Sequence, residues 1–226
     1  MTETEPPFEI TPQILLRAYS IGMFPMADSA QDKTIFWVDP EERGIFPLEQ
    51  MIISTSLAKA VRADKWHIRI DHDFEATINA CAEATHERPN TWINHKIKTL
   101  YLQLHYMGFA HSVEVYDDQH GLVGGLYGLQ MGAAFFGESM FHRARDASKI
   151  ALIHLVARLR YAGFQLLDTQ FITPHLARLG AIEIPRADYH DRLERALGAT
   201  AQFFGWPKDK PMSGADALRL VREGQL

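Results

Sequence analysis

Residues 112–140 read SVEVYDDQHGLVGGLYGLQMGAAFFGESM, and the pattern of this stretch decides the fold class. Residues 112–116 alternate along the chain as a half-buried strand does, and residues 117–121 have the composition of a turn. A glycine-rich strand follows over 122–130, then a tight turn at Met131 and Gly132, and then a third strand over 133–140. Three strands joined by short turns predict an antiparallel sheet.

Helical patterns flank these strands. Residues 147–161 carry apolar residues at helical spacing and end at Gly163, after which residues 164–169 form an apolar strand. Upstream, the pattern predicts helices over 56–62, 73–85 and 93–106, with a strand over 66–70. The order strand–strand–strand–helix–strand is typical of an α+β fold, with helices packed on a mixed, mostly antiparallel sheet. The acetyltransferase-like fold has this order, and so do other α+β folds.

The beginning of the chain predicts a small separate unit. Residues 1–9 hold three Glu and two Pro and are typical of a disordered leader. Thr11 can cap a helix that has Pro12 in its first turn and ends before Gly22. Residues 28–49 are rich in Pro, Gly and charge around a short apolar piece at 35–38. We therefore predict an N-terminal unit over 1–48 and a larger domain over 49–226, whose tail carries a short helix at 213–222.

Composition limits the class of protein. With 46% hydrophobic and 23% charged residues among 226, the chain falls in the ordinary globular range, which excludes a disordered or fibrous protein. Its apolar runs are shorter than the roughly 18 residues that a membrane span needs, and its acidic start is no secretory signal. A single cysteine, Cys81, excludes an intramolecular disulfide and a multi-cysteine zinc site. We expect a cytoplasmic protein without a membrane partner, and a net charge of −5 disfavours nonspecific DNA binding.

Common catalytic signatures do not occur: the chain has no GxxxxGK, HExxH or GxSxG motif. The cluster GLVGGLYGLQMG lies within a hairpin, where glycines favour close backbone approach over a nucleotide-binding loop. An acetyl-coenzyme A enzyme needs a glycine-rich loop before the helix at residue 147, and that connection reads FHRARDASK. Its lack of glycine argues against an ordinary acetyltransferase.

Three polar residues interrupt apolar strands and are candidate catalytic groups. Glu138 ends the strand AAFFGESMF, and Asp168 and Gln170 share one face of FQLLDTQF at a period of two. A carboxylate held among apolar neighbours loses solvation, which favours proton acceptance. The alternative is a carboxylate that caps a neighbouring loop.

Basic and aromatic residues supply candidate binding groups. Lys59, Arg62 and Lys65 form a basic cluster, and Lys59 and Arg62 are one helical turn apart, which suits a phosphate ridge. A solvated helix face is the alternative. Aromatic residues such as Tyr19, Trp92 and Tyr101 belong to a core or stack on a base.

Together these segments resemble the leucyl/phenylalanyl-tRNA–protein transferase family. The matching segments, in family order from Thr11 to Leu197, are AYSIGMFPM, FWVDPEERGIFP, TWI, GFAHSVEVYDD, GLVGGLYGL, FFGESMF, DASKIAL, LLDTQF and HLARLGAIEIPR. The resemblance implies transfer of Leu, Phe or Met from aminoacyl-tRNA to the α-amine of proteins that begin with Arg or Lys, which marks them for N-end-rule degradation. It also implies an acetyltransferase-like catalytic domain that binds aminoacyl-adenosine, no metal or cofactor, and a monomer.

The resemblance also implies residue roles. Gln170 is expected to orient or relay a proton from the attacking amine, Asp168 to polarise it as the base, and Glu138 to bind substrate amines nearby. The basic cluster Lys59, Arg62 and Lys65 is expected to meet the acceptor stem of the tRNA. The remaining matches form the aminoacyl-adenosine site: Tyr19, Met26, Trp92, Tyr101, Leu126, Phe135, Leu152, Leu155 and Leu159.

Two departures from the family pattern bear on specificity. The family often has further residues before the first helix, and this chain nearly lacks them. We therefore expect a trimmed N-terminal unit with weaker tRNA or acceptor contacts. Met26 stands where the family has an aromatic residue, which replaces a rigid ring by a flexible thioether. Two other functions remain open at this point: a small-molecule N-acyltransferase that uses acetyl-coenzyme A, and a non-catalytic module that binds RNA or degrons.

Overall fold

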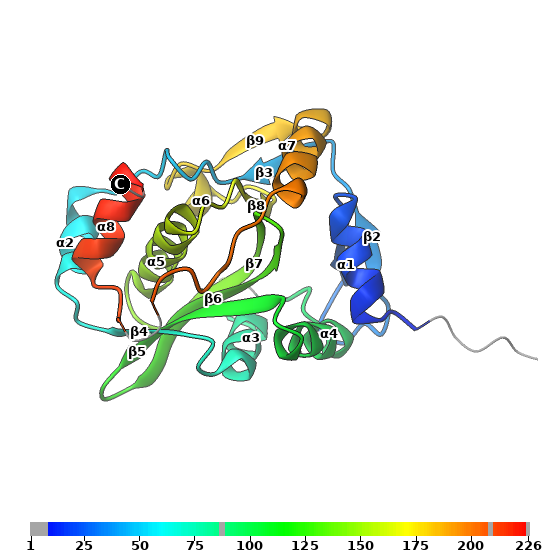
Figure 1. Cartoon of the computed structure of the whole chain (residues 1–226). Helices are drawn as coiled ribbons and strands as arrows, with labels where there is room; N and C mark the ends of the chain where they lie inside the picture. The colour runs from blue at the N-terminus through cyan, green and yellow to red at the C-terminus, as the bar shows by residue number, and fades with distance from the viewer. Residues whose placement is uncertain (1–8, 86–88, 208–209, 225–226) are drawn as a thin grey trace, which may run out of the picture.

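The structure, a computed structural model, describes residues 9–85, 89–207 and 210–224 (Figure 1). The predicted disordered leader lies outside these residues except for residue 9. The elements in chain order are α1 (Pro12–Ser20), β1 (Phe24–Met26), β2 (Phe36–Val38), β3 (Glu42–Ile45), α2 (Thr55–Arg62), β4 (His67–Ile70), α3 (Phe74–Ala82), α4 (His95–Tyr106), β5 (Ala110–Asp117), β6 (Gly121–Met131), β7 (Ala134–His142), α5 (Ala147–Tyr161), β8 (Leu166–Gln170), α6 (Pro174–Ala177), β9 (Ile182–Pro185), α7 (Arg186–Gly198) and α8 (Gly214–Glu223).

A seven-stranded sheet organises the molecule in the order β4-β5-β6-β7-β8-β3-β9. Every neighbouring pair is antiparallel except β7 and β8, which are joined through α5 and run parallel. The prediction of an α+β fold with a mostly antiparallel sheet and packed helices is confirmed. Strands β1 and β2 form a separate two-stranded ribbon beside it.

The predicted hairpins and the helix after them occur where the pattern places them. Strands β5, β6 and β7 form a continuous antiparallel meander, and α5 has the predicted bounds. The glycine cluster serves close approach, because a Cβ built on Gly124 would lie 2.5 Å from the Cβ of Ala147 at the start of α5. Gly124 therefore lets the start of α5 pack directly on the sheet.

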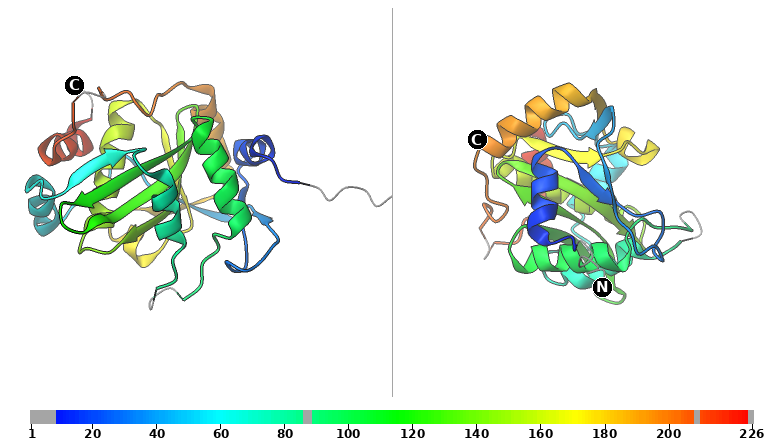
Figure 2. Two further views of the ribbon diagram at one scale, coloured as in Figure 1. Left: turned by 90° about the horizontal axis from the view of Figure 1, so that it is seen from below. Right: turned by 90° about the vertical axis from the view of Figure 1, so that its right-hand side faces the viewer.

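Helices cover both faces of the sheet and define two apolar cores. Helices α5, α2 and α8 enclose one core, which includes Val113, Phe135 and Leu155. Helices α1, α3, α4 and α7 enclose the other, which includes Tyr19, Tyr127 and Phe136. Figure 2 shows α3 and α4 crossing the sheet from one side, with α1 beyond its edge.

Two irregularities occur in the middle of the sheet, close to Glu138 and Asp168. The pairing of β7 with β8 ends at Phe136 and Asp168, although β7 continues to His142. On its other side, β7 pairs Gly137 with Gly128 and Ser139 with Tyr127, so Glu138 is the extra residue of a β-bulge. Bulges re-aim side chains and are common beside active sites.

The segment predicted as an N-terminal unit contributes to the central sheet. Strand β3 lies between β8 and β9, and its main chain pairs with both. Residues 32–34 of the preceding loop are held by Asn94, whose amide donates to the carbonyl oxygens of Asp32 and Thr34. The boundary at residues 48/49 stays a prediction, but β3 packs within the larger domain.

Three elements after β8 were not predicted: α6, β9 and α7. The predicted tail helix is present as α8, where Ser213 and Asp216 form a capping box. Among the described residues, no helix combines the length and the apolar character that crossing a membrane requires.

Candidate functional site

A buried ion pair links β3 to β8. Arg43 Nη2 lies 2.6 Å from Asp168 Oδ2, and Arg43 Nε lies 3.0 Å from Asp168 Oδ1. The two residues are 1% and 0% exposed. Asp168 is desolvated, as the sequence predicts, but it is not isolated, because a guanidinium fork neutralises it.

Two further donors complete the surroundings of Asp168. The hydroxyl of Tyr189, on α7, donates to Oδ2 at 2.8 Å, and the backbone N–H of Gln170 donates to Oδ1 at 2.8 Å. A carboxylate offers about four acceptor positions, and these four donors occupy them. Asp168 therefore acts here as a fixed acceptor that organises its neighbours.

Gln170 has an unusual backbone conformation. Its φ of +56° lies in the left-handed region, so the simple alternation that placed Asp168 and Gln170 on one face does not hold at this residue. Gly44 opposite it makes the conformation possible, since a Cβ there would lie 2.8 Å from the carbonyl carbon of Phe171. The buried Gln170 Nε2 finds no hydrogen-bond partner among the described residues. The site thus contains a buried amide donor without a partner among these residues.

Glu138 forms the second half of the site. Its Oε1 accepts a hydrogen bond of 2.7 Å from the Tyr19 hydroxyl of α1, which also bonds to the hydroxyl of Tyr101 of α4. Burial raises the pKa of Glu138 to about 8, although the hydrogen bonds of the two tyrosines act in the opposite direction. The structure therefore brings together three predicted site residues from three distant elements.

Accessibility separates the two carboxylates. The Asp168 side chain is fully enclosed, whereas Glu138 is half-buried. Of the two carboxylates, Glu138 is therefore the more exposed. Gln170, at 7% exposed, lies between these extremes.

The predicted apolar pocket residues also come together, on the α5 face of the sheet. They are buried members of a single core cluster: Leu126, Phe135, Leu152, Leu155 and Leu159. The carboxylates lie on the opposite side with the second core. Beyond Phe136, β7 pairs with β6 but no longer with β8.

The other predicted aminoacyl-adenosine residues differ in exposure. Trp92 is half-buried at the edge of the second core, and Met26 is half-buried at the end of β1, opposite Phe36. Tyr101 is 0% exposed, with its ring edge against Tyr127 at 5.4 Å between centroids. Its ring has no accessible face for stacking in this structure.

The basic cluster lies away from these groups. Lys59 and Arg62 are exposed on α2, and Lys65 is exposed just beyond it. Figure 1 shows α2 beside α8 at the opposite end of the molecule from α1. The structure thus groups the cluster as predicted but does not bring it to the carboxylates.

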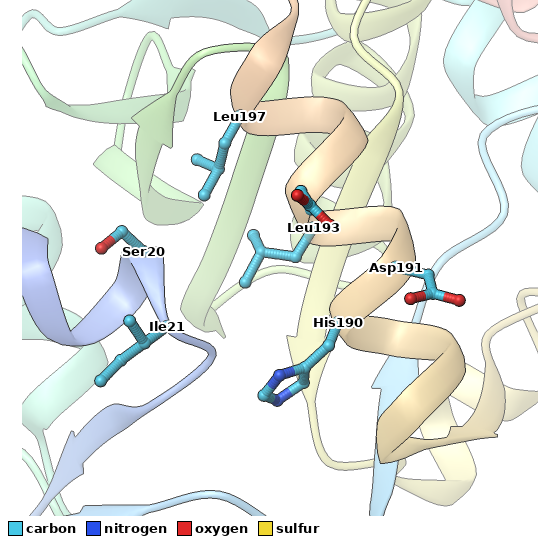
Figure 3. A pocket seen from close by; sticks show the side chains of 7 residues that line it. Ser20, Ile21, His190, Asp191, Leu193 and Leu197 are labelled. Atoms are coloured by element: carbon cyan, nitrogen blue, oxygen red, sulfur yellow. The ribbon is translucent and has the colours of Figure 1, made fainter.

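A cavity of about 310 Å³ lies between the end of α1 and α7 (Figure 3). None of the predicted site residues lines it, but two of its residues directly follow Tyr19 and Tyr189 along the chain. Its lining residues are Ser20, Ile21, His190, Asp191, Leu193, Glu194 and Leu197.

Sequence reasoning missed Arg43 and Tyr189. Arg43 lies in FWVDPEERGIFP, whose local pattern does not indicate a catalytic group. Its adjacent Gly44 offered the single local signal, as a point of close backbone approach. Tyr189 gave none, because its contact with Asp168 depends on where α7 packs.

Comparison with known proteins shows which family the chain resembles. One family model, leucyl/phenylalanyl-tRNA protein transferase, matches residues 45–194, and a second, the N-terminal domain of that transferase, matches residues 8–41. These matches show that the chain is an aminoacyltransferase. More particularly, the chain belongs to the leucyl/phenylalanyl-tRNA–protein transferase family.

Relatives of that name match nearly the whole chain. The transferase of Afipia carboxidovorans is 56% identical over 95% of this chain and 94% of its own length. That of Nitrobacter winogradskyi is 55% identical over 95% of each chain. That of Paramagnetospirillum magneticum is 57% identical over 86% of this chain and 92% of its own.

Proposed function

We propose that this protein transfers Leu, Phe or Met from the 3′ end of aminoacyl-tRNA to the N-terminal α-amine of proteins that begin with Arg or Lys. The amine nitrogen attacks the ester carbonyl carbon and forms a peptide bond. The bond from that carbon to the ribose oxygen breaks, the amine loses a proton, and the ribose oxygen gains one. The activated ester is supplied by the tRNA, so the proposal includes no metal or cofactor.

The observation that carries this proposal is the position of Glu138 and Gln170 at the end of the β7–β8 pairing: Phe136, two residues before Glu138, is opposite Asp168, two residues before Gln170. Glu138 is the carboxylate that a substrate amine can reach, and Gln170 offers an unpaired amide donor. We assign Glu138 to the amine and Gln170 to the ester. Asp168, saturated by four donors, holds the backbone of Gln170 in place of acting directly as the base.

The electrostatics of Glu138 suit this role. An α-amine has a pKa of roughly 7.7–8.0, and burial raises the pKa of Glu138 to about 8. Proton transfer between groups of matched pKa has little free-energy cost in either direction. The ionised form of Glu138, whose fraction increases as the pH approaches 8, can therefore take the proton that an incoming ammonium must lose before attack.

Several finer features belong to the same proposal. The parallel β7–β8 pair that separates beside the site supports an acetyltransferase-like catalytic domain. Leu126, Phe135, Leu152, Leu155 and Leu159 would receive the transferred side chain. Trp92 and Met26 would lie around the adenosine, and the buried Tyr19 and Tyr101 would hold Glu138 beside it. The basic cluster would meet the acceptor stem. We propose a cytoplasmic enzyme that acts as a monomer.

The test is turnover with Phe-charged tRNA and a peptide that begins with Arg. The proposal predicts a new N-terminal Phe on the peptide and release of uncharged tRNA in equal amounts. A matched peptide that begins with Ala, and acetyl-coenzyme A in place of the charged tRNA, serve as controls. Acetylation of the peptide would favour the small-molecule acyltransferase, and binding without transfer would favour a non-catalytic module.

A further inference from the structure

We propose that Arg43 is a positioning residue for the transfer reaction. Its guanidinium holds Asp168, and through that carboxylate it fixes the backbone of Gln170 in the conformation that presents the Gln170 amide. The proposal rests on the function proposed above. Arg43 belongs to the N-terminal part of the chain. Asp168 and Gln170 both belong to the motif LLDTQ, which is far from Arg43 in the sequence.

The contact between Arg43 and Asp168 has the geometry of a two-point clamp. Nε and Nη2 each meet a different carboxylate oxygen, at 3.0 and 2.6 Å. Such a fork fixes the plane and the rotation of the carboxylate, which a single point charge does not. The direction of both Asp168 oxygens is therefore set by β3.

The remaining contacts of Arg43 prevent it from acting on a substrate. Nη1 donates to the carbonyl oxygen of Gly22 at 2.8 Å, and the guanidinium lies 4.5 Å from the ring centre of Phe24 and 4.4 Å from that of Tyr189. At 1% exposure, no face of the group is open to a ligand. Arg43 therefore acts on the reaction through its neighbours: its hydrogen bonds fix Asp168, and its positive charge also lowers the pKa of Glu138.

Asp168 transmits this influence to Gln170. Oδ1, fixed by Arg43 Nε, accepts the backbone N–H of Gln170 at 2.8 Å. A non-glycine residue at a φ of +56° persists only where its surroundings hold it there. The neighbouring Gly44 leaves room for the turn at residues 169–171, so adjacent residues of β3 supply both the clamp and the space.

The first test replaces Arg43 by Lys, which keeps the charge and loses the fork. We expect the single-turnover rate at saturating Phe-charged tRNA to fall roughly 10–100-fold, because a small misplacement of a catalytic group has that effect. The Kd for the charged tRNA should stay within twofold. Arg158→Lys is the matched control: Arg158 is also buried but donates to the carbonyl oxygen of Phe203, away from the site.

A second readout does not depend on activity. In Arg43→Lys, backbone hydrogen exchange of a peptide covering residues 168–171 should rise at least tenfold, and in Arg158→Lys it should not. If exchange in that segment is faster in Arg43→Lys but the parent enzyme has no transferase activity, the proposed function is rejected and the positioning by Arg43 stands. Unchanged exchange in that segment, or transfer within twofold of the parent, overturns the role of Arg43.

A double-mutant cycle covers the case in which Arg43→Lys does not fold. Arg43→Gln combined with Asp168→Asn leaves no unpaired charge in the interior. If Arg43 acts through Asp168, the double variant transfers no more slowly than Asp168→Asn alone. If the fold-losses in rate of Arg43→Gln and Asp168→Asn multiply in the double variant, Arg43 acts independently of Asp168 and the proposal is overturned.

Discussion

The hydroxyl of Tyr19 donates to Glu138 at 2.7 Å and so joins the first helix of the chain to a bulge in the middle of the sheet. Arg43 makes a similar connection from β3 to Asp168. Each carboxylate of the site is therefore completed by a residue from the first 45 of the chain. A catalytic domain lacking this part would keep the carboxylates and lose their partners.

Replacing Tyr19 by Phe should shift the pH dependence of transfer. The Tyr19 hydroxyl lowers the pKa of Glu138 by donating to its charged form, so its loss should raise that pKa further and move the rate profile to higher pH. We expect transfer at pH 7 to be roughly three- to tenfold slower. Single-turnover rates between pH 6 and 9 test this, with Tyr106→Phe, at an exposed tyrosine, as the control.

Glu138→Gln should remove a pH dependence of stability. Between about pH 5 and 8, folded Glu138 holds a proton that the unfolded chain lacks, since its pKa rises from roughly 4.3 to about 8 on folding. The free energy of unfolding should then fall with rising pH by at most about 1.4 kcal/mol per unit, and the Gln variant should lack this contribution.

Urea unfolding at pH 5.5, 6.5, 7.5 and 8.5 measures the difference between the two proteins. Glu183→Gln, at an exposed position of β9, provides the control. The Glu138→Gln variant should gain stability over the parent as the pH rises. Parallel curves across this range would mean that Glu138 keeps the same affinity for protons in both states.

Gln170→Glu tests whether the side chain of Gln170 acts in the reaction as a hydrogen-bond donor or as an acceptor. The substitution keeps size and an acceptor oxygen but removes the N–H that has no partner among the described residues. If this N–H stabilises the oxygen of the tetrahedral intermediate, transfer should fall roughly 10²–10³-fold with little change in tRNA affinity. Gln119→Glu, in an exposed turn, is the control. Retained or faster transfer would instead support the proton relay expected from the sequence.

The elements between residues 55 and 170 could be predicted because each has a local signal. Helices α2 and α4 begin after the capping side chains of Ser54 and Asn94, and the meander alternates at a period of two. Strand β9 lacks such a signal, because three of its four residues are exposed and its partner β3 is far along the chain. Helix α7 does have a local signal, because Tyr189, Leu193 and Ala196 have helical spacing among charged residues.

The candidate site could be predicted only in part, for a similar reason. Asp168, Gln170 and Glu138 lie in apolar strands where a polar residue stands out. The Arg43–Asp168 pair spans 125 residues and forms only because β3 inserts beside β8, which no local pattern indicates. The bulge at Glu138 depends on a mismatch in register between two strands, so neither strand alone reveals it.

Replacing Lys59, Arg62 and Lys65 together by Ala should weaken tRNA binding in a salt-dependent way. These residues are exposed, so the substitution removes charge without disturbing the core. Each lost phosphate contact should lower the slope of log Kd against log salt by about one unit. A control removes three exposed cations elsewhere, Lys96, Arg192 and Arg195. Equal slopes for the parent and the first variant would place the acceptor stem on another surface.

Met26→Trp should narrow the range of transferred amino acids. Met26 is half-buried at the end of β1 and packs at the edge of the core that contains Tyr19. A thioether with three rotatable side-chain bonds adapts to several ligand shapes, whereas an indole offers one rigid surface. An added aromatic contact contributes about 0.5–1.5 kcal/mol, so relative kcat/KM values should change by up to roughly tenfold.

Competition among Leu-, Phe- and Met-charged tRNAs for one peptide that begins with Arg measures this selectivity. The ratios of the three products should change in Met26→Trp and stay as in the parent in Met107→Trp, which places the same ring at an exposed methionine. The β-ribbon also bears on the outcome, because Met26 pairs with Phe36 across the strands. If the product ratios do not change while Met26→Trp stays folded, Met26 contacts only this ribbon. The methionine at this position then has no influence on which amino acid is transferred.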